Sequence, residues 1–176
     1  MTLDKEQLDV VLARYQALRQ EVLELRRSGD LAGAIAKAHT AVDYMEQKQD
    51  GLAYFLTAAH DLAALYGAIG DWKSAEPIFE KSLYVRGRVW GTDHENTATA
   101  SMMLGVARYS LAKYPEAEEL LNACIAVRRK VFGTSHPQVA LALMNLAAVY
   151  DKTGREDEAA TLRRDAERMG LPDGPN

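Results

Sequence analysis

Residues Gly70–Leu111, GDWKSAEPIFEKSLYVRGRVWGTDHENTATASMMLGVARYSL, are followed directly by a second version of the same pattern, Ala112–Thr153, AKYPEAEELLNACIAVRRKVFGTSHPQVALALMNLAAVYDKT. Each residue of the first segment aligns with the residue 42 positions later. Far more of these pairs are identical than in two unrelated segments. The identical pairs include Ala75 with Ala117, Val85 with Val127, Arg86 with Arg128, Gly91 with Gly133, and His94 with His136. A period of this length is typical of solenoids and repeat arrays.

The composition excludes several classes of protein. The 176 residues are 48% hydrophobic and 26% charged, which suits one domain or one short array. The net charge of −4 gives no electrostatic reason to expect a nucleic-acid partner. No apolar run is long enough to cross a membrane, the N-terminus lacks a signal-peptide profile, and the single Cys124 excludes an internal disulfide. We therefore expect a cytoplasmic protein that does not contact membranes.

Apolar residues recur at helical spacing throughout, and glycine-containing turns divide the pattern into eight expected helices. The first stripe ends near Gly29 and consists of Leu8, Val11, Tyr15, Leu18, Val22 and Leu25. Later helices are expected over 31–50, 52–69, 72–90, 93–111, 114–132, 136–153 and 156–169. The turns Gly91-Thr92-Asp93 and Gly133-Thr134-Ser135 are expected to end one helix and cap the next. Pro77 is expected to bend its helix or delay the first turn.

The paired helices carry residues that identify a family. Leu62-Ala63-Ala64-Leu65-Tyr66, Leu104-Gly105-Val106-Ala107-Arg108 and Leu146-Ala147-Ala148-Val149-Tyr150 each precede a helix with an alanine near its start, at Ala75, Ala117 or Ala159. This pattern resembles the tetratricopeptide repeat. The longer period and the string 131–137, VFGTSHP, resemble the long-helix repeats of kinesin light chains and their bacterial relatives.

The resemblance implies an all-α fold, a right-handed α-solenoid of four antiparallel helix pairs. The pairs are expected at about 4–48, 52–90, 93–132 and 136–169, forming a single domain over 1–169 with a disordered tail at 170–176. Small residues are expected where the helices of a pair approach each other, because a bulky side chain there would separate them. Glu21 and Val22 depart from the pattern in the first pair, and Arg163 replaces the apolar Phe79 and Leu121 in the last, so both ends are expected to cap the array.

In proteins of this family the first helices of successive pairs line a concave groove, which the resemblance implies is a peptide-binding surface here. The groove candidates are Arg19, Arg26, Thr57, His60, Asp61, Thr99, Met102, Met103, Tyr109, Leu141, Met144 and Asn145. Methionines suit a surface that adapts to varied apolar partners, but Met102 and Met144 could equally pack between helices. Asn145 matches an asparagine that holds the peptide backbone in the related repeats, whereas Asp61 and Met103 replace it in earlier pairs. Arg19 and Arg26 could bind a carboxylate, or form a solvated basic helix end.

The four histidines and the cysteine do not form a recognisable chemical motif. His94 and His136 occupy equivalent helix starts and are separated by a helix, so a shared metal ion is not expected and a structural role is favoured. Cys124 occupies a small packing position, which predicts a buried, inert thiol. No phosphate loop, zinc motif or nucleophile motif is present, so we expect no metal and no cofactor.

The sequence therefore predicts a non-catalytic scaffold or adaptor that binds a protein or peptide segment in its groove. One alternative is self-association, possible as a homodimer, through Trp90, Phe132 and the stripe of the first helix. Another is a small-ligand or catalytic pocket around His60, Asp61 and Tyr109.

Overall fold

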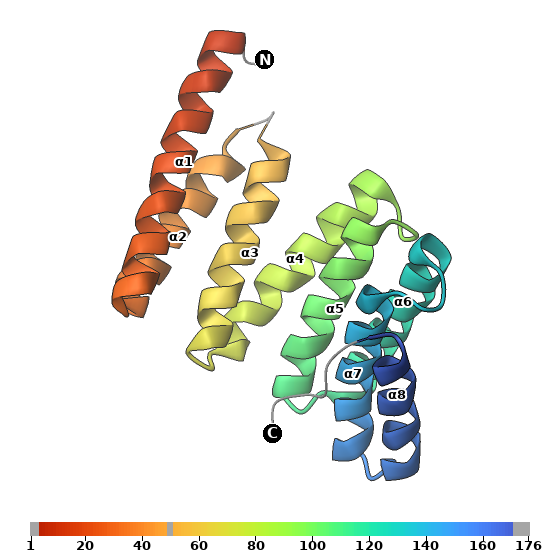
Figure 1. Cartoon of the computed structure of the whole chain (residues 1–176). Helices are drawn as coiled ribbons and strands as arrows, with labels where there is room; N and C mark the ends of the chain where they lie inside the picture. Colours follow the sequence, from red (N-terminus) through yellow and green to blue (C-terminus); the bar gives the residue numbers. More distant parts are fainter. Residues whose placement is uncertain (1–3, 49–50, 171–176) are drawn as a thin grey trace. The chain divides into compact units, whose positions relative to one another are not determined.

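The computed structural model describes residues 4–48 and 51–170, and these residues form eight α-helices (Figure 1). The helices are α1 (Lys5–Ser28), α2 (Leu31–Glu46), α3 (Leu52–Ala68), α4 (Trp72–Trp90), α5 (Glu95–Ser110), α6 (Tyr114–Phe132), α7 (Pro137–Lys152) and α8 (Glu156–Arg168). Their boundaries lie within a few residues of those expected, with α2 ending earliest relative to the prediction. The expected disordered tail lies, after Gly170, outside the described residues.

The chain forms two compact units, Met1–Ser82 and Leu83–Asn176, and the boundary falls inside α4. The first unit contains α1, α2, α3 and the first turns of α4. The second contains the remainder of α4 and α5 to α8.

In the first unit, α1 packs against α2, and α2 packs against α3. The apolar stripe of α1 is buried at Val11, Leu18 and Val22, which confirms that α1 is a packed helix of the array. Ala34 and Ala63 are fully buried, as expected for small residues at close helix contacts.

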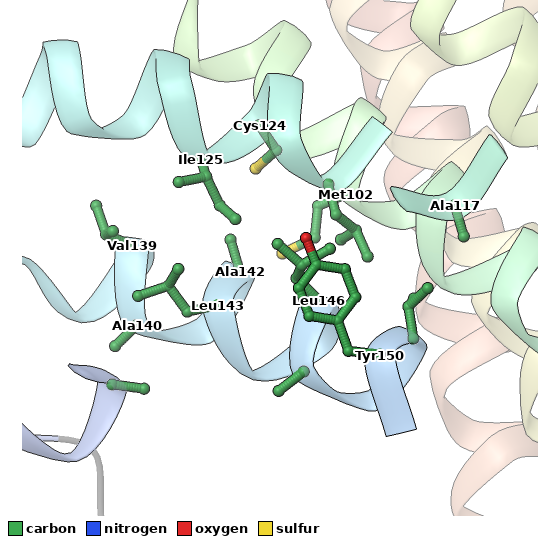
Figure 2. Packing of buried hydrophobic residues seen from close by; sticks show 14 of the residues in the cluster. Met102, Ala117, Cys124, Ile125, Val139, Ala140, Ala142, Leu143, Leu146 and Tyr150 are labelled. Carbon is green, nitrogen blue, oxygen red and sulfur yellow. The ribbon is translucent and has the colours of Figure 1, made fainter. Parts of the chain in front are cut away.

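The second unit has a continuous hydrophobic core in which α5 packs on α6, α6 on α7, and α7 on α8 (Figure 2). Small residues again mark the closest approaches. A Cβ atom added at Gly105 would lie 3.1 Å from Cγ of Leu121, so a larger residue would force these helices apart. Ala117, Ala147 and Ala159 are fully buried, which confirms the predicted contact positions.

The turns before α5 and α7 have the same structure, and the residues that cap these two helices differ from those expected. Gly91 and Gly133 have φ angles of 86° and 84°, the left-handed conformation that ends a helix and favours glycine. The N-caps are His94 and His136, one residue after the expected Asp93 and Ser135. Each imidazole Nδ1 accepts a backbone N–H two residues later, which provides the acceptor that an Asp or Ser side chain would otherwise supply.

The effect of Pro77 on its helix also differs in part from the one expected. Helix α4 begins at Trp72, five residues before Pro77, so the proline does not delay the first turn. Proline lacks the N–H that would bond to the carbonyl four residues earlier, and α4 continues past it nonetheless. Fully buried Ala75 and buried Phe79 hold this part of α4 in the core, which explains why the helix tolerates the loss.

Candidate functional site

The predicted groove residues come from the first helix of each pair, which places them on α1 and α3 in the first unit and on α5 and α7 in the second. The structure brings together some of these residues within each unit. It also assigns one of them, Met102, to the core rather than to a surface.

An ion pair joins α1 to α3 in the first unit. Nε of Arg19 donates a hydrogen bond of 2.8 Å to Oδ2 of Asp61. The two residues lie 42 positions apart, on the first helices of two successive pairs. The bond to Asp61 raises the pKa of Arg19, and the Arg19 side chain remains 45% exposed. This charged pair is available at the surface, where a ligand could contact either partner.

Tyr15 lies close to this pair and carries a buried hydroxyl. The Tyr15 hydroxyl has no hydrogen-bond partner among the described residues, and burial raises the pKa of Tyr15 to about 12. A space of about 10 Å³ is lined by Tyr15, Arg19 and Asp61, among others. That volume is near the minimum for one water molecule, so this space is too small for an organic ligand.

The other predicted residues of the first unit have less distinctive environments. The Thr57 hydroxyl donates to the carbonyl of Ala53 in its own helix at 2.9 Å. His60 is half-buried on α3 beside Asp61, whose carboxylate is bound to Arg19. Arg26 lies exposed in the last turn of α1, where a cation is favoured by the helix dipole, and this agrees with the solvated-helix-end interpretation.

Met102 belongs to the core of the second unit. Its side chain is 5% exposed and lies among the packed residues of α6 and α7 (Figure 2). Its sulfur accepts a hydrogen bond of 3.3 Å from Nη1 of Arg128. Of the two interpretations of Met102, the structure supports packing between helices.

The surface of α5 and α7 nevertheless presents apolar atoms. Met103, Tyr109 and Met144 are half-buried and pack against the core, while Leu141 is 41% exposed. Asn145 is half-buried, and its Nδ2 donates to the carbonyl of Leu141 at 3.0 Å. These five residues form the surface that we call the α5–α7 face.

Thr99, the remaining candidate, belongs to a buried network that sequence reasoning missed. Arg128 is 1% exposed, and it donates to Oε1 of Glu95, to Oγ1 of Thr99 and to the carbonyl of Gln138. The distance from Nη2 of Arg128 to Oε1 of Glu95 is 3.2 Å. The identity of Arg86 and Arg128 in the repeat was the available signal, since Arg86 also donates to the carbonyl of Asn96, the equivalent of Gln138.

The thiol of Cys124 is fully buried, as predicted, and burial raises its pKa to about 11, which keeps it in the less reactive protonated form. Within the described ranges, no group of three His, Cys, Asp or Glu residues could hold a metal ion. In that same part of the chain, no helix combines the length and apolar character needed to cross a membrane.

A comparison with protein families matches the tetratricopeptide repeat over residues 54–130 and 102–169. The chain belongs to the tetratricopeptide repeat family. This establishes an all-α fold of eight described helices that follow one another as four pairs. Proteins with this repeat are generally non-catalytic interaction scaffolds.

Solved structures of kinesin-light-chain type share the fold of this tetratricopeptide repeat protein. A putative kinesin light chain repeat structure from Podospora anserina has a TM-score of 0.76 at 20% identity, covering 91% of this chain and 78% of that chain. BtubC (BKLC) from P. vanneervenii has a TM-score of 0.73 at 22% identity, covering 88% of this chain and 64% of that chain. The chain therefore spans less than two thirds of BtubC. The apo form of RapI has a TM-score of 0.78 at 14% identity, covering 90% of this chain and 43% of that chain. No curated protein sequence matches the chain significantly.

Proposed function

We propose that this tetratricopeptide repeat protein is a non-catalytic scaffold that binds a protein or peptide segment, and that the α5–α7 face is the contact surface. The observation that carries the proposal is the uncovered apolar surface of Met103, Leu141 and Met144 on helices whose other faces are well packed. Flexible, polarisable methionines beside an exposed leucine adapt to apolar side chains of different shapes. Asn145 and Tyr109 supply polar groups beside this apolar surface.

The ion pair of Arg19 and Asp61 provides a second, charged contact point on the first unit. Such exposed pairs contribute about 0–1 kcal/mol to stability, so exchanging one partner for a ligand group has a small cost. A charged side chain of the bound segment would replace one partner of this ion pair. Its recognition would therefore not depend on the burial of apolar surface.

The proposal is tested with Leu141→Glu and Met144→Glu, because each places a carboxylate on the α5–α7 face. Met102→Glu is unsuitable, since it would bury a charge in the core. Tyr84→Glu is the matched control, because Tyr84 is an exposed aromatic residue on α4 that belongs to neither candidate surface. We expect lysate proteins captured by wild type and by Tyr84→Glu to be lost from both face variants, as measured by mass spectrometry of pull-downs. Capture that is equal in all four proteins, with helicity unchanged, would exclude this face.

Self-association is the second candidate, and it is favoured by Val89 and Val131, which are each 48% exposed at equivalent positions. Their neighbours Trp90 and Phe132 stack on His94 and His136 of the same chain, which uses part of the aromatic surface predicted for a dimer. Light scattering across concentration distinguishes the candidates, because a strict monomer leaves only the scaffold function.

A further inference from the structure

We propose that the cleft between α2, α3 and the first turns of α4 binds a small carboxylic acid with one aromatic ring. This cleft lies in the first unit and does not include the residues proposed to bind a protein segment. Its volume is about 220 Å³. An apolar cavity of about 150 Å³ is known to hold one benzene molecule, so this cleft accommodates a ring with a short side chain.

The cleft has an apolar floor and a polar entrance. Phe55, Ala59 and Leu62 of α3 form the floor and are 6%, 3% and 2% exposed. Val42 of α2 and Ile78 of α4 form half-buried walls. This gradient from buried floor to half-buried wall is the arrangement by which proteins enclose the apolar part of a small ligand.

The cleft lies beside a position of the repeat that carries a small residue in this pair. Ala59 corresponds to Ser101 in the third pair and to Leu143 in the fourth. Leu143 is 1% exposed and belongs to the packed core of the second unit (Figure 2). The methyl group of Ala59 therefore leaves room that a leucine fills in the equivalent place, and the fold itself does not require an opening there.

The entrance of the cleft favours a negatively charged group. Exposed His39 and Lys81 line it, and none of the lining residues is acidic. Nζ of Lys81 lies 5.1 Å from the centroid of the Phe55 ring and forms an ion pair with Glu46. A ring on the cleft floor would thus place its carboxylate beside the ammonium of Lys81.

Glu46 is the competitor for this ammonium, and the competition is weak. The side chains of Lys81 and Glu46 are 51% and 50% exposed. Exposed ion pairs of this kind contribute little to stability, so a ligand carboxylate can replace Glu46 at small cost. Nε2 of His39 lies 2.7 Å from the Tyr66 hydroxyl and its ring lies 5.8 Å from the Tyr66 ring, and these contacts hold the imidazole at the edge of the cleft.

The experiment titrates the full chain with phenylacetate and, separately, with its uncharged analogue 2-phenylethanol, and it follows both by two-dimensional amide NMR. We expect saturable shifts confined to residues of α2, α3 and the start of α4. For ligands of this size we expect a dissociation constant for phenylacetate on the order of 1 mM. The absence of saturable shifts for both probes up to about ten times that concentration would overturn the proposal.

Four variants assign the parts of the site. Ala59→Leu should fill the cleft and weaken both probes at least about tenfold, and Val42→Phe should do the same from the wall if the first variant does not fold. Lys81→Met should weaken phenylacetate about threefold or more without changing 2-phenylethanol. Glu46→Gln should strengthen phenylacetate alone, because it removes the competing carboxylate.

Lys130→Met is the matched control for the charge, because Lys130 is another exposed lysine with an acidic partner, Asp93, at 2.6 Å. It should bind both probes as wild type does. Phenylacetate binding that is unchanged in folded Ala59→Leu and Val42→Phe would place the ligand elsewhere and overturn the site. Equal effects of Lys81→Met on both probes, or equal weakening by Lys130→Met, would overturn the assignment of the carboxylate.

Discussion

Arg128 is the largest fully buried side chain of the described residues, and its charge is balanced locally by Glu95. The guanidinium joins three helices, since Glu95 and Thr99 lie on α5, Arg128 on α6 and Gln138 on α7. Oε2 of Glu95 is buried without a partner among these same residues, while Oε1 accepts from Arg128 and from the Thr99 hydroxyl. Removing one member of a buried pair leaves an uncompensated charge, which costs far more than losing an exposed pair.

Because the Glu95 side chain is 26% exposed, we predict that Arg128→Met lowers the free energy of unfolding by about 3 kcal/mol, the lower end for a buried pair, in urea denaturation followed by circular dichroism. Lys130→Met, which removes the exposed pair with Asp93, should change it by about 0–1 kcal/mol. The double variant Arg128→Met with Glu95→Gln should regain part of the loss, because no unpaired charge remains. Equal losses for Arg128→Met and Lys130→Met would show that the buried network does not stabilise the second unit.

At the scale of the helix, α5 and α7 each begin with a histidine that caps the helix and stacks on an aromatic ring. Nδ1 of His136 accepts the N–H of Gln138 at 3.2 Å, and its ring lies 4.5 Å from the Phe132 ring at an angle of 16°. The equivalent distance between the rings of His94 and Trp90 is 6.0 Å. One side chain thus connects the end of a helix to the beginning of the next across a glycine turn.

We predict that His136→Ala lowers the free energy of unfolding by about 1–2 kcal/mol, because it removes both the cap and the ring contact. His94→Ala should cost less, since its rings are farther apart. His136→Asn should recover the part due to the cap, as asparagine is a favoured N-cap residue. Amide exchange at Gln138 supplies a local measurement, and it should be faster in the alanine variant alone. Equal exchange in His136→Ala and wild type would contradict a capping role.

The helices themselves were predictable because the apolar period and the glycine turns act locally. The chemistry at their ends was harder to predict. Asp93 and Ser135 have the side chains that usually cap helices, whereas His94 and His136 take that position because each ring also stacks on an aromatic residue from the preceding helix. Sequence propensity describes the cap alone, and the additional ring contact depends on how the turn folds.

At the scale of the whole molecule, the repeat predicted the fold but did not determine which side of each helix is open. Met102 and Met144 are identical residues at equivalent positions, yet Met102 is buried beside Arg128 while Met144 is half-buried. The difference depends on neighbours from other helices, which the pattern along one helix does not contain. The cleft between α2, α3 and α4 was missed for the same reason, although the series Ala59, Ser101 and Leu143 indicated a place where the side-chain volume changes.

Both units carry a buried group that should make the folded chain sensitive to alkaline pH. Burial raises the pKa of Tyr15 in the first unit from 10.0 to about 12, and that of Cys124 in the second unit from 9.0 to about 11. Below pH 9 both groups are protonated in the folded and unfolded states, so their contribution to stability is fully present. As the pH rises above each unfolded pKa, the unfolded state loses a proton that the folded state retains, and unfolding becomes more favourable until the folded pKa is reached.

We predict that the free energy of unfolding falls between pH 9 and 12, with each group contributing a slope of about 1.4 kcal/mol per pH unit within its own window. Tyr15→Phe should remove the part between pH 10 and about 12 and should cost little at pH 7, because the hydroxyl has no partner among the described residues. Cys124→Ala, which introduces the residue found at the equivalent Ala166, should remove the part between pH 9 and about 11. Urea denaturation at pH 8.0, 9.5 and 11 of wild type, both single variants and the double variant measures these slopes. Because the two windows begin at pH 9 for Cys124 and pH 10 for Tyr15, each variant should flatten the profile only in its own window, and a double variant as steep as wild type would exclude these groups as the source.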